Sequence, residues 1–234
     1  MSNPQVVSAL RRELASVIAA RQAAKSDPKL HAARLAVRAF QAQRMADTHA
    51  DQLASPDTRA AAQFFLHDLY STADLTDRDA SLERVVPAME RLLPAAALAT
   101  VADAITLDAL SERLDAAMAD RLGETFAEND YIEAYRKAGT RADRELQIDH
   151  VASVGRALCE LIRVPLIGST LAMMRGPAKL AGLGELQSFL ERGFKAFKSM
   201  KDPRAFVDTA VQRETAIMRR LYAGEAEPFR SRSG

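Results

Sequence analysis

The sequence predicts an all-α protein, a single compact bundle of about eight to ten helices, several of them broken by proline or glycine. Asp27-Pro28, Ser55-Pro56 and Asp202-Pro203 each precede a long amphipathic segment. An Asp or Ser followed by proline is typical of a helix start, since proline has no N–H to leave unpaired there. Alanine and leucine dominate, and aromatic residues make up only 6%. No segment alternates apolar and polar residues as a half-buried strand does.

Apolar residues spaced three and four apart predict the helices of the N-terminal half, because this spacing places them on one face. These helices are expected over residues 4–24, 28–53, 57–70 and 76–93. Val7, Leu10 and Leu14 begin such a face in the first of them. Pro87 lies inside the last one, where a proline deletes a backbone hydrogen bond, so we expect a kink or a break there.

In the C-terminal half, glycine and capping residues mark the helix ends. A helical stretch from Pro94, restarting near Thr106, is expected to end at Gly123, which tolerates the left-handed backbone that follows a helix. Thr140 and Asp143 have the spacing of a capping box and predict a helix start. Further helices are expected over 130–138, from Glu185 and from Pro203 to near Gly224. The sequence thus predicts one helical domain over residues 1–224 and a flexible C-terminal tail over 225–234.

The segment 163–185 is apolar in its first half and is interrupted by glycine and proline. We expect it to fold into the interior of the bundle in short pieces, since a segment apolar on all sides is buried or meets something apolar. It forms either a buried hairpin or a pocket for an apolar or amphipathic small molecule. In the pocket, Met173 and Met174 would line irregular gaps, and Arg163, Arg175 or Lys179 would bind an anionic head.

A second candidate region combines aromatic and titratable side chains in Phe64-Phe65-Leu66-His67-Asp68-Leu69-Tyr70, followed by Arg78. Asp68 and Tyr70 could direct polar groups into a pocket. Alternatively, the aromatic residues anchor the helix while an aspartate pairs with Arg78. Both interpretations remain open. The candidate site residues are therefore His49, His67, Asp68, Tyr70, Arg78, Arg163, Met173, Met174 and Arg175.

No motif in the sequence indicates a metal or a cofactor. A di-iron bundle site needs a glutamate three residues before a histidine, and none of the four histidines has one. Asp47, His49 and Asp51 are two residues apart, so on a helix they diverge and cannot face one ion. The glycines match neither a Walker loop nor a dinucleotide fingerprint, and Gly-x-Ser-x-Gly is absent.

Charge and hydropathy exclude further classes of partner. Lysine and arginine total 32 against 31 acidic residues, so no strong field draws the chain to nucleic acid. The longest uncharged apolar stretch, Val164 to Met174, is shorter than the roughly 18 residues of a membrane span. Cys159 is the only cysteine, so no internal disulfide can form. We expect a cytoplasmic protein with no transmembrane segment and no nucleic-acid partner.

The chain carries three motifs together: Phe64-Phe65-Leu66-x-Asp68-Leu69-Tyr70, Arg78-Asp79 and Gly182-Leu183-Gly184-Glu185-Leu186-Gln187-x-Phe189-Leu190-Glu191. With them it resembles, from about Leu35 to Leu221, a family of uncharacterised all-helical proteins from proteobacteria. The resemblance implies a soluble bacterial helical protein and supplies no activity, cofactor or catalytic residue.

Three hypotheses for function follow from the sequence. The first is a non-enzymatic binding protein for an apolar or amphipathic small molecule, based on the apolar segment 163–185. The second is a protein-interaction or scaffold module, with a homodimer as one form, that uses the same apolar surface or the stripe of Phe189, Phe194 and Phe197. The third is a helical-bundle enzyme with acid–base groups among His49, His67, Asp68, Tyr70 and Tyr131.

Overall fold

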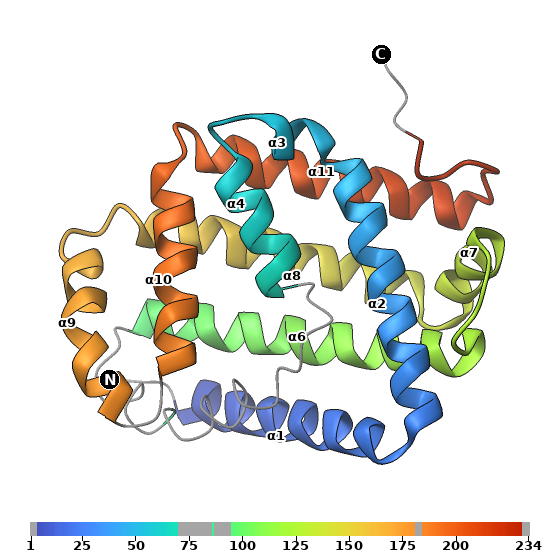
Figure 1. Cartoon of the computed structure of the whole chain (residues 1–234), viewed down its shortest axis with the longest axis horizontal. Helices are drawn as coiled ribbons and strands as arrows, with labels where there is room; N and C mark the ends of the chain where they lie inside the picture. The colour runs from blue at the N-terminus through green and yellow to red at the C-terminus, as the bar shows by residue number, and fades with distance from the viewer. Residues whose placement is uncertain (1–3, 70–85, 87–94, 181–183, 231–234) are drawn as a thin grey trace.

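The computed structural model describes residues 4–69, 86, 95–180 and 184–230, and within these ranges it contains helices and no strand, which confirms the all-α class (Figure 1). The helices are α1 (Pro4–Ser26), α2 (Pro28–Thr48), α3 (Ala50–Ala54), α4 (Arg59–Phe64), the π-helix η1 (Phe65–Leu69), α6 (Ala95–Leu122), α7 (Glu128–Lys137), α8 (Arg141–Leu161), α9 (Ile167–Leu180), α10 (Gly184–Ser199) and α11 (Pro203–Ala223).

The long helices α1, α6, α8 and α11 form a layer in which each packs against the next (Figure 1). Helices α2, α4 and α10 cross this layer on one face; α2 packs on α6, and α10 packs on α4. α9 lies at one end of the molecule beside α10. None of the helices in the described ranges is long and apolar enough to cross a membrane.

Two of the three predicted proline starts are confirmed. The side chain of Asp27 accepts hydrogen bonds from the backbone N–H groups of Lys29 and Leu30, and that of Asp202 accepts one from Ala205. Each carboxylate thereby satisfies donors that have no partner within the helix.

The third proline start is wrong, because the helix after Ser55-Pro56 begins only at Arg59, after a turn. The carboxylate of Asp57, within this turn, accepts a hydrogen bond from the backbone N–H of Lys201 at 3.0 Å. This contact ties the turn to the connection between α10 and α11.

Other helix boundaries also differ from the prediction. The helix predicted over 28–53 is divided at His49, whose φ of −113° and ψ of 24° interrupt α2 and begin α3. α6 continues through Thr106 without a restart. The helix predicted over 76–93, with its kink at Pro87, lies outside the described residues except for residue 86.

The predicted helix ends and the capping box are confirmed. Gly123 and Gly224 have φ values of 65° and 79°, the left-handed conformation that glycine adopts without steric cost. The hydroxyl of Thr140 accepts a hydrogen bond from the N–H of Asp143 at 3.1 Å, and the N–H of Thr140 donates to the Asp143 carboxylate at 2.9 Å. Two otherwise unpaired donors at the start of α8 are thereby satisfied.

The hydrophobic core consists of several clusters, and each joins a different set of helices. One cluster joins α4, α8, α10 and α11 around Phe197 and Phe206. Another joins α2, α6 and α7 around Val37, Met118 and Tyr131. In the first cluster α8 and α11 approach closely at Gly155, where an added Cβ would lie 2.7 Å from Cγ1 of Val207.

Residues 225–230, which the sequence analysis assigns to a flexible tail, pack against the second cluster. The Phe229 ring lies 6.0 Å from the Tyr131 ring and 6.3 Å from the Phe40 ring, measured between centroids. Arg220 donates a hydrogen bond from Nη1 to the carbonyl of Arg230 at 3.0 Å. The aromatic burial holds this part of the chain in place.

The expectation that the segment 163–185 folds into the interior is wrong for its described part. α9 is one continuous helix with Pro177 inside it, and it packs on α10 with one side only. The side chains of Leu166, Met173 and Leu180 are 77%, 78% and 91% exposed. Apolar composition alone did not bury this segment, because no described helix covers its other side.

Candidate functional site

A buried ion network joins α1, α2 and α6, and the sequence analysis missed it. The carboxylate of Glu112 accepts a hydrogen bond from Arg21 at 2.9 Å and one from Arg38 at 2.7 Å, and it also pairs with Arg34. Arg21 also donates to Asp108 at 2.8 Å. Burial and the neighbouring Arg38 lower the pKa of Arg34 to about 10, so it stays charged at neutral pH.

The network continues along α6 to Asp115. Gln41 donates a hydrogen bond to this carboxylate at 2.9 Å. Burial raises the pKa of Asp115, against the opposing effect of Gln41 and of nearby arginines. Nearby, the buried Arg144 lies over the Tyr135 ring at 4.1 Å. Arg21, Arg38 and Gln41 each donate to a carboxylate of α6, and neither of the two grooves described below reaches these groups. A structural role is therefore favoured.

A signal for this network does exist in the sequence. Arg34, Arg38 and Gln41 are spaced four and three residues apart, and so are Asp108, Glu112 and Asp115. This spacing places each set on one face of its helix, and the two faces carry groups of opposite charge or matching hydrogen-bonding character. Two such complementary stripes on neighbouring helices predict a polar seam between them.

His49 lies buried where α2 meets α3, 7% exposed, and its contacts are within the fold. Its Nδ1 lies 2.9 Å from Oε1 of Gln52, and its Nε2 lies 3.5 Å from Oε1 of Glu214. Arg44 donates to both oxygens of that glutamate. Burial acts to raise the pKa of Glu214, but Arg44 and the His49 contact outweigh it and lower the pKa to about 2.

Among the described residues, no contact joins another predicted site residue to His49. His67 is exposed on η1, and Arg163 pairs with Glu160 at 3.6 Å. Arg175 pairs with Glu191 of α10 at 2.7 Å. The side chain of Asp68, together with the whole of Tyr70 and Arg78, lies outside the described residues. A pocket made jointly by His49 and α9 is thus not formed by the described residues, while Met173, Met174 and Arg175 do share α9.

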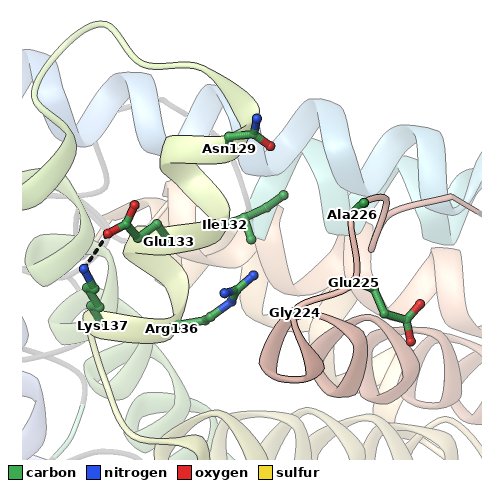
Figure 2. Close-up of a pocket in the computed structure, with 8 residues that line it drawn as sticks. All are labelled: Asn129, Ile132, Glu133, Arg136, Lys137, Gly224, Glu225 and Ala226. Carbon is green, nitrogen blue, oxygen red and sulfur yellow. Dashed lines mark hydrogen bonds and ion pairs between the residues drawn. The ribbon is translucent and has the colours of Figure 1, made fainter.

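Two open grooves lie near the C-terminal end of α11. The larger has a volume of about 400 Å³ and lies between α7 and residues 224–226 (Figure 2). Lys137 pairs with Glu133 along α7, and the side chain of Arg136 extends toward the end of α11 (Figure 2). The second, of about 340 Å³, is lined by Glu128, Glu227, Phe229 and Arg230. Neither is an enclosed apolar cavity of the kind that holds an apolar ligand.

The side of α9 that faces away from α10 is an exposed and uncharged surface. With about 100° per residue, six residues of α9, Met173 included, lie within about 60° of Met173 around the helix axis, and Leu166 immediately before the helix completes a set of seven. All seven are exposed, three are large and apolar, and none is charged. We call this surface the outer face of α9; its residues are Leu166, Ser169, Thr170, Met173, Gly176, Pro177 and Leu180.

Contacts with α10 fix the orientation of this face. The amide of Gln187 donates to the carbonyl of Leu171, and an added Cβ at Gly168 would lie 3.0 Å from the Phe194 ring. Ala178 is buried on the same side. Since the opposite side of the helix is packed, rotation that would hide the outer face from solvent would break these contacts.

Leu166, at the start of the outer face, has an unfavourable backbone conformation. Its φ is 74°, and it is the only non-glycine residue with a positive φ within the described ranges. Its carbonyl accepts hydrogen bonds at 2.8 Å from the N–H of Thr170 and from the hydroxyl of Ser169, so it caps α9. A leucine in this conformation costs of the order of 1 kcal/mol relative to glycine. The fold therefore keeps a strained residue whose side chain is in solvent.

Comparison with known proteins places the chain in a family. The profile of the family described as "Domain of unknown function (DUF8198)" matches residues 20–228, which is most of the chain. The chain therefore belongs to this family. No curated protein and no solved structure matches it.

Proposed function

We propose that this member of the DUF8198 family is a protein-interaction module that binds its partner through the outer face of α9. The observation that carries the proposal is the exposure of Leu166, Met173 and Leu180 on one uncharged side of a packed helix. Scattered exposed apolar residues are ordinary, but an apolar stripe along a helix face is the pattern that helix-binding partners use.

The strained backbone at Leu166 supports the same function. Strained residues persist where the surrounding structure imposes them, and they are enriched at binding sites. Glycine at this position would remove the strain and leave an exposed backbone. Leucine instead places a large apolar side chain at the edge of the outer face. A binding role accounts for a residue that the isolated fold does not favour.

Methionine at the centre of the face also suits an interaction surface. Met173 is unbranched and polarisable, so its side chain adapts to an apolar partner. Ser169, Thr170 and Gly176 flank it and are small, so a partner helix can approach the backbone of α9 between the large residues. The nearby cation Arg175 is paired with Glu191 and would not be stranded when the face is covered.

The small-molecule hypothesis has less support. An apolar ligand needs a concave site that buries most of its surface. Among the described residues neither groove is lined by the apolar side of α9, and half or more of the residues that line each groove near α11 are charged. The enzyme hypothesis stays a prediction, and the burial of His49 between Gln52 and Glu214 favours a structural role for that residue.

A site-specific photo-crosslinker tests the proposal. Benzoylphenylalanine replaces Met173 in cells that make the protein, and the matched control places it at Leu146, an exposed apolar residue of α8 that is 48% exposed. We expect irradiation to link a polypeptide to position 173 and not to position 146. If neither position yields an adduct, or both yield the same adducts, the outer face of α9 is not a binding surface.

A further inference from the structure

We infer that His49 is a pH-sensitive clamp: with both ring nitrogens protonated, its side chain links the break between α2 and α3 to α11, and loss of one proton opens the link. The ring lies between Gln52 of α3 and Glu214 of α11. The inference is independent of the proposed function, because none of these residues belongs to the outer face of α9.

The hydrogen bonds of Gln52 determine what the first ring nitrogen carries. The amide nitrogen of Gln52 lies 3.4 Å from the carbonyl oxygen of Phe206 in α11, and a carbonyl oxygen only accepts. The amide nitrogen therefore faces Phe206, and the amide oxygen faces His49, 2.9 Å from Nδ1. Because that oxygen is also only an acceptor, Nδ1 of His49 carries a proton and donates it.

The second ring nitrogen also faces an acceptor. Nε2 of His49 lies 3.5 Å from Oε1 of Glu214. Although burial acts to raise the pKa of Glu214, Arg44 and His49 lower it to about 2, so this group is a carboxylate wherever histidines titrate. A neutral imidazole has one N–H and one lone pair. With the N–H at Nδ1, the lone pair would point at the carboxylate, whereas the imidazolium donates to both acceptors.

Charged groups also approach the break from α2, α3 and α11, and each of them is paired. Arg44 of α2 donates to both oxygens of Glu214. Arg213 of α11 donates to both oxygens of Asp51 of α3 and to the backbone carbonyl of Thr48. Burial and the charge of Arg44 oppose a second cation here. The carboxylate of Glu214 has about four lone-pair sites, however, so it accepts from the arginine and the imidazolium together.

The position of His49 at a helix end favours the same protonation. His49 is the C-cap of α2, a helix of 21 residues whose last turn contains no basic side chain. The unpaired carbonyls at a helix C-terminus carry a partial negative charge that stabilises a nearby cation. α3 begins at the next residue with the opposite polarity, but it has only five residues. The second proton therefore stabilises the end of α2 as well as the link to α11.

This arrangement gives the clamp its pH dependence. The folded chain binds the second proton more tightly than the unfolded chain, in which the ring has no fixed acceptors. The contribution to stability is therefore present at the acidic end of the range in which histidine changes charge, about pH 5 to 8, and is lost as the pH rises through that range. Glu214 itself acts in the opposite direction, since its contribution is lost as the pH falls towards 2.

Nitrogen-15 NMR of the imidazole groups in the full chain tests the protonation. The signals of His49 are assigned in a chain in which the other three histidines, His31, His67 and His150, are replaced by glutamine. We expect both ring nitrogens of His49 to carry protons at about pH 5.5 and one of them to have lost its proton at about pH 8. A ring with a single proton at the lower pH overturns the inference, and so does a ring that keeps both protons at the higher pH.

A double-mutant cycle in urea unfolding tests the link to α11. It compares wild type, His49→Gln, Glu214→Gln and the double variant at the same two pH values. We expect the coupling between the two residues to favour folding by about three- to tenfold at about pH 5.5 and by less than about twofold at about pH 8. His31→Gln changes an exposed histidine near the start of α2 and is the matched control, with no coupling to Glu214 at either pH. A coupling of His49 with Glu214 that is equal at both pH values overturns the clamp.

Discussion

Arg44 and Glu214, 170 positions apart in the sequence, face each other across α2 and α11, with Nη1 of the arginine 2.6 and 2.7 Å from the two carboxylate oxygens. His49 approaches the same carboxylate at 3.5 Å from the break between α2 and α3. The contact therefore holds the C-terminal helix against the point where the second helix is interrupted. The side chain of Glu214 is largely buried, so the charges are weakly screened.

This ion pair predicts a stability that depends on pH. The pKa of Glu214 is lowered from 4.5 to about 2 in the folded protein. Its stabilising effect is complete above pH 4.5 and is lost as the pH falls from about 4.5 to about 2. The difference corresponds to at most about 3 kcal/mol of unfolding free energy. Urea unfolding at several pH values measures it in the wild-type chain and in Glu214→Gln, which has no carboxyl to titrate. A stability difference between the two chains that stays constant from pH 6 to pH 2.5 would contradict the prediction.

The buried network around Glu112 predicts a large loss of stability on neutralisation. Glu112→Gln removes the negative charge that faces Arg21, Arg34 and Arg38, so three cations share a site with less compensation. Removing one partner of a buried ion pair costs about 3–5 kcal/mol. Denaturant unfolding measures the loss, and Asp120→Asn, an exposed change on the same helix, is expected to cost less than about 0.5 kcal/mol. Equal effects of the two variants would contradict a role for burial.

The close contact between Gly155 and Val207 predicts that a substitution which normally favours a helix destabilises this one. Gly155→Ala gains up to about 1 kcal/mol of helix propensity, but its Cβ would lie 2.7 Å from Cγ1 of Val207. We expect a net destabilisation of about 1–3 kcal/mol as α8 and α11 move apart. Adding Val207→Ala removes the overlap, so the double variant is expected to lose less than the sum of the two single losses. Additive losses in thermal unfolding would show that the helices do not meet at this contact.

The backbone at Leu166 predicts that stability and association change in opposite directions. Leu166→Gly and Leu166→Ala both remove the exposed side chain, and only glycine relieves the positive φ of 74°. We expect the glycine variant to be about 1 kcal/mol more stable than the alanine variant. Both are expected to bind the partner of the outer face of α9 more weakly than wild type. Thermal unfolding and the yield of the photo-crosslink at position 173 measure the two effects, and equal stabilities would show that residue 166 is not strained.

Much of the fold was predictable because its signals are local. Asp27, Asp202 and Thr140 cap their helices through side chains that reach only two or three residues, so the sequence contains both partners of each contact. Gly123 and Gly224 end their helices through their own conformational freedom. In the candidate site, the sequence indicated that Met173 and its neighbours are important but not that they face solvent.

The sequence by itself determined the helical class and most helix boundaries, because hydrogen bonds within a turn and the helical period depend on neighbouring residues. Only the tertiary structure decided that Asp57 binds the backbone of Lys201, that Glu112 pairs with three arginines, and that the apolar side of α9 faces solvent. Each of these depends on which distant helix lies opposite, and burial is a property of that packing. Composition sets how favourable it is to cover a surface, whereas the arrangement of the other helices decides whether the surface is covered.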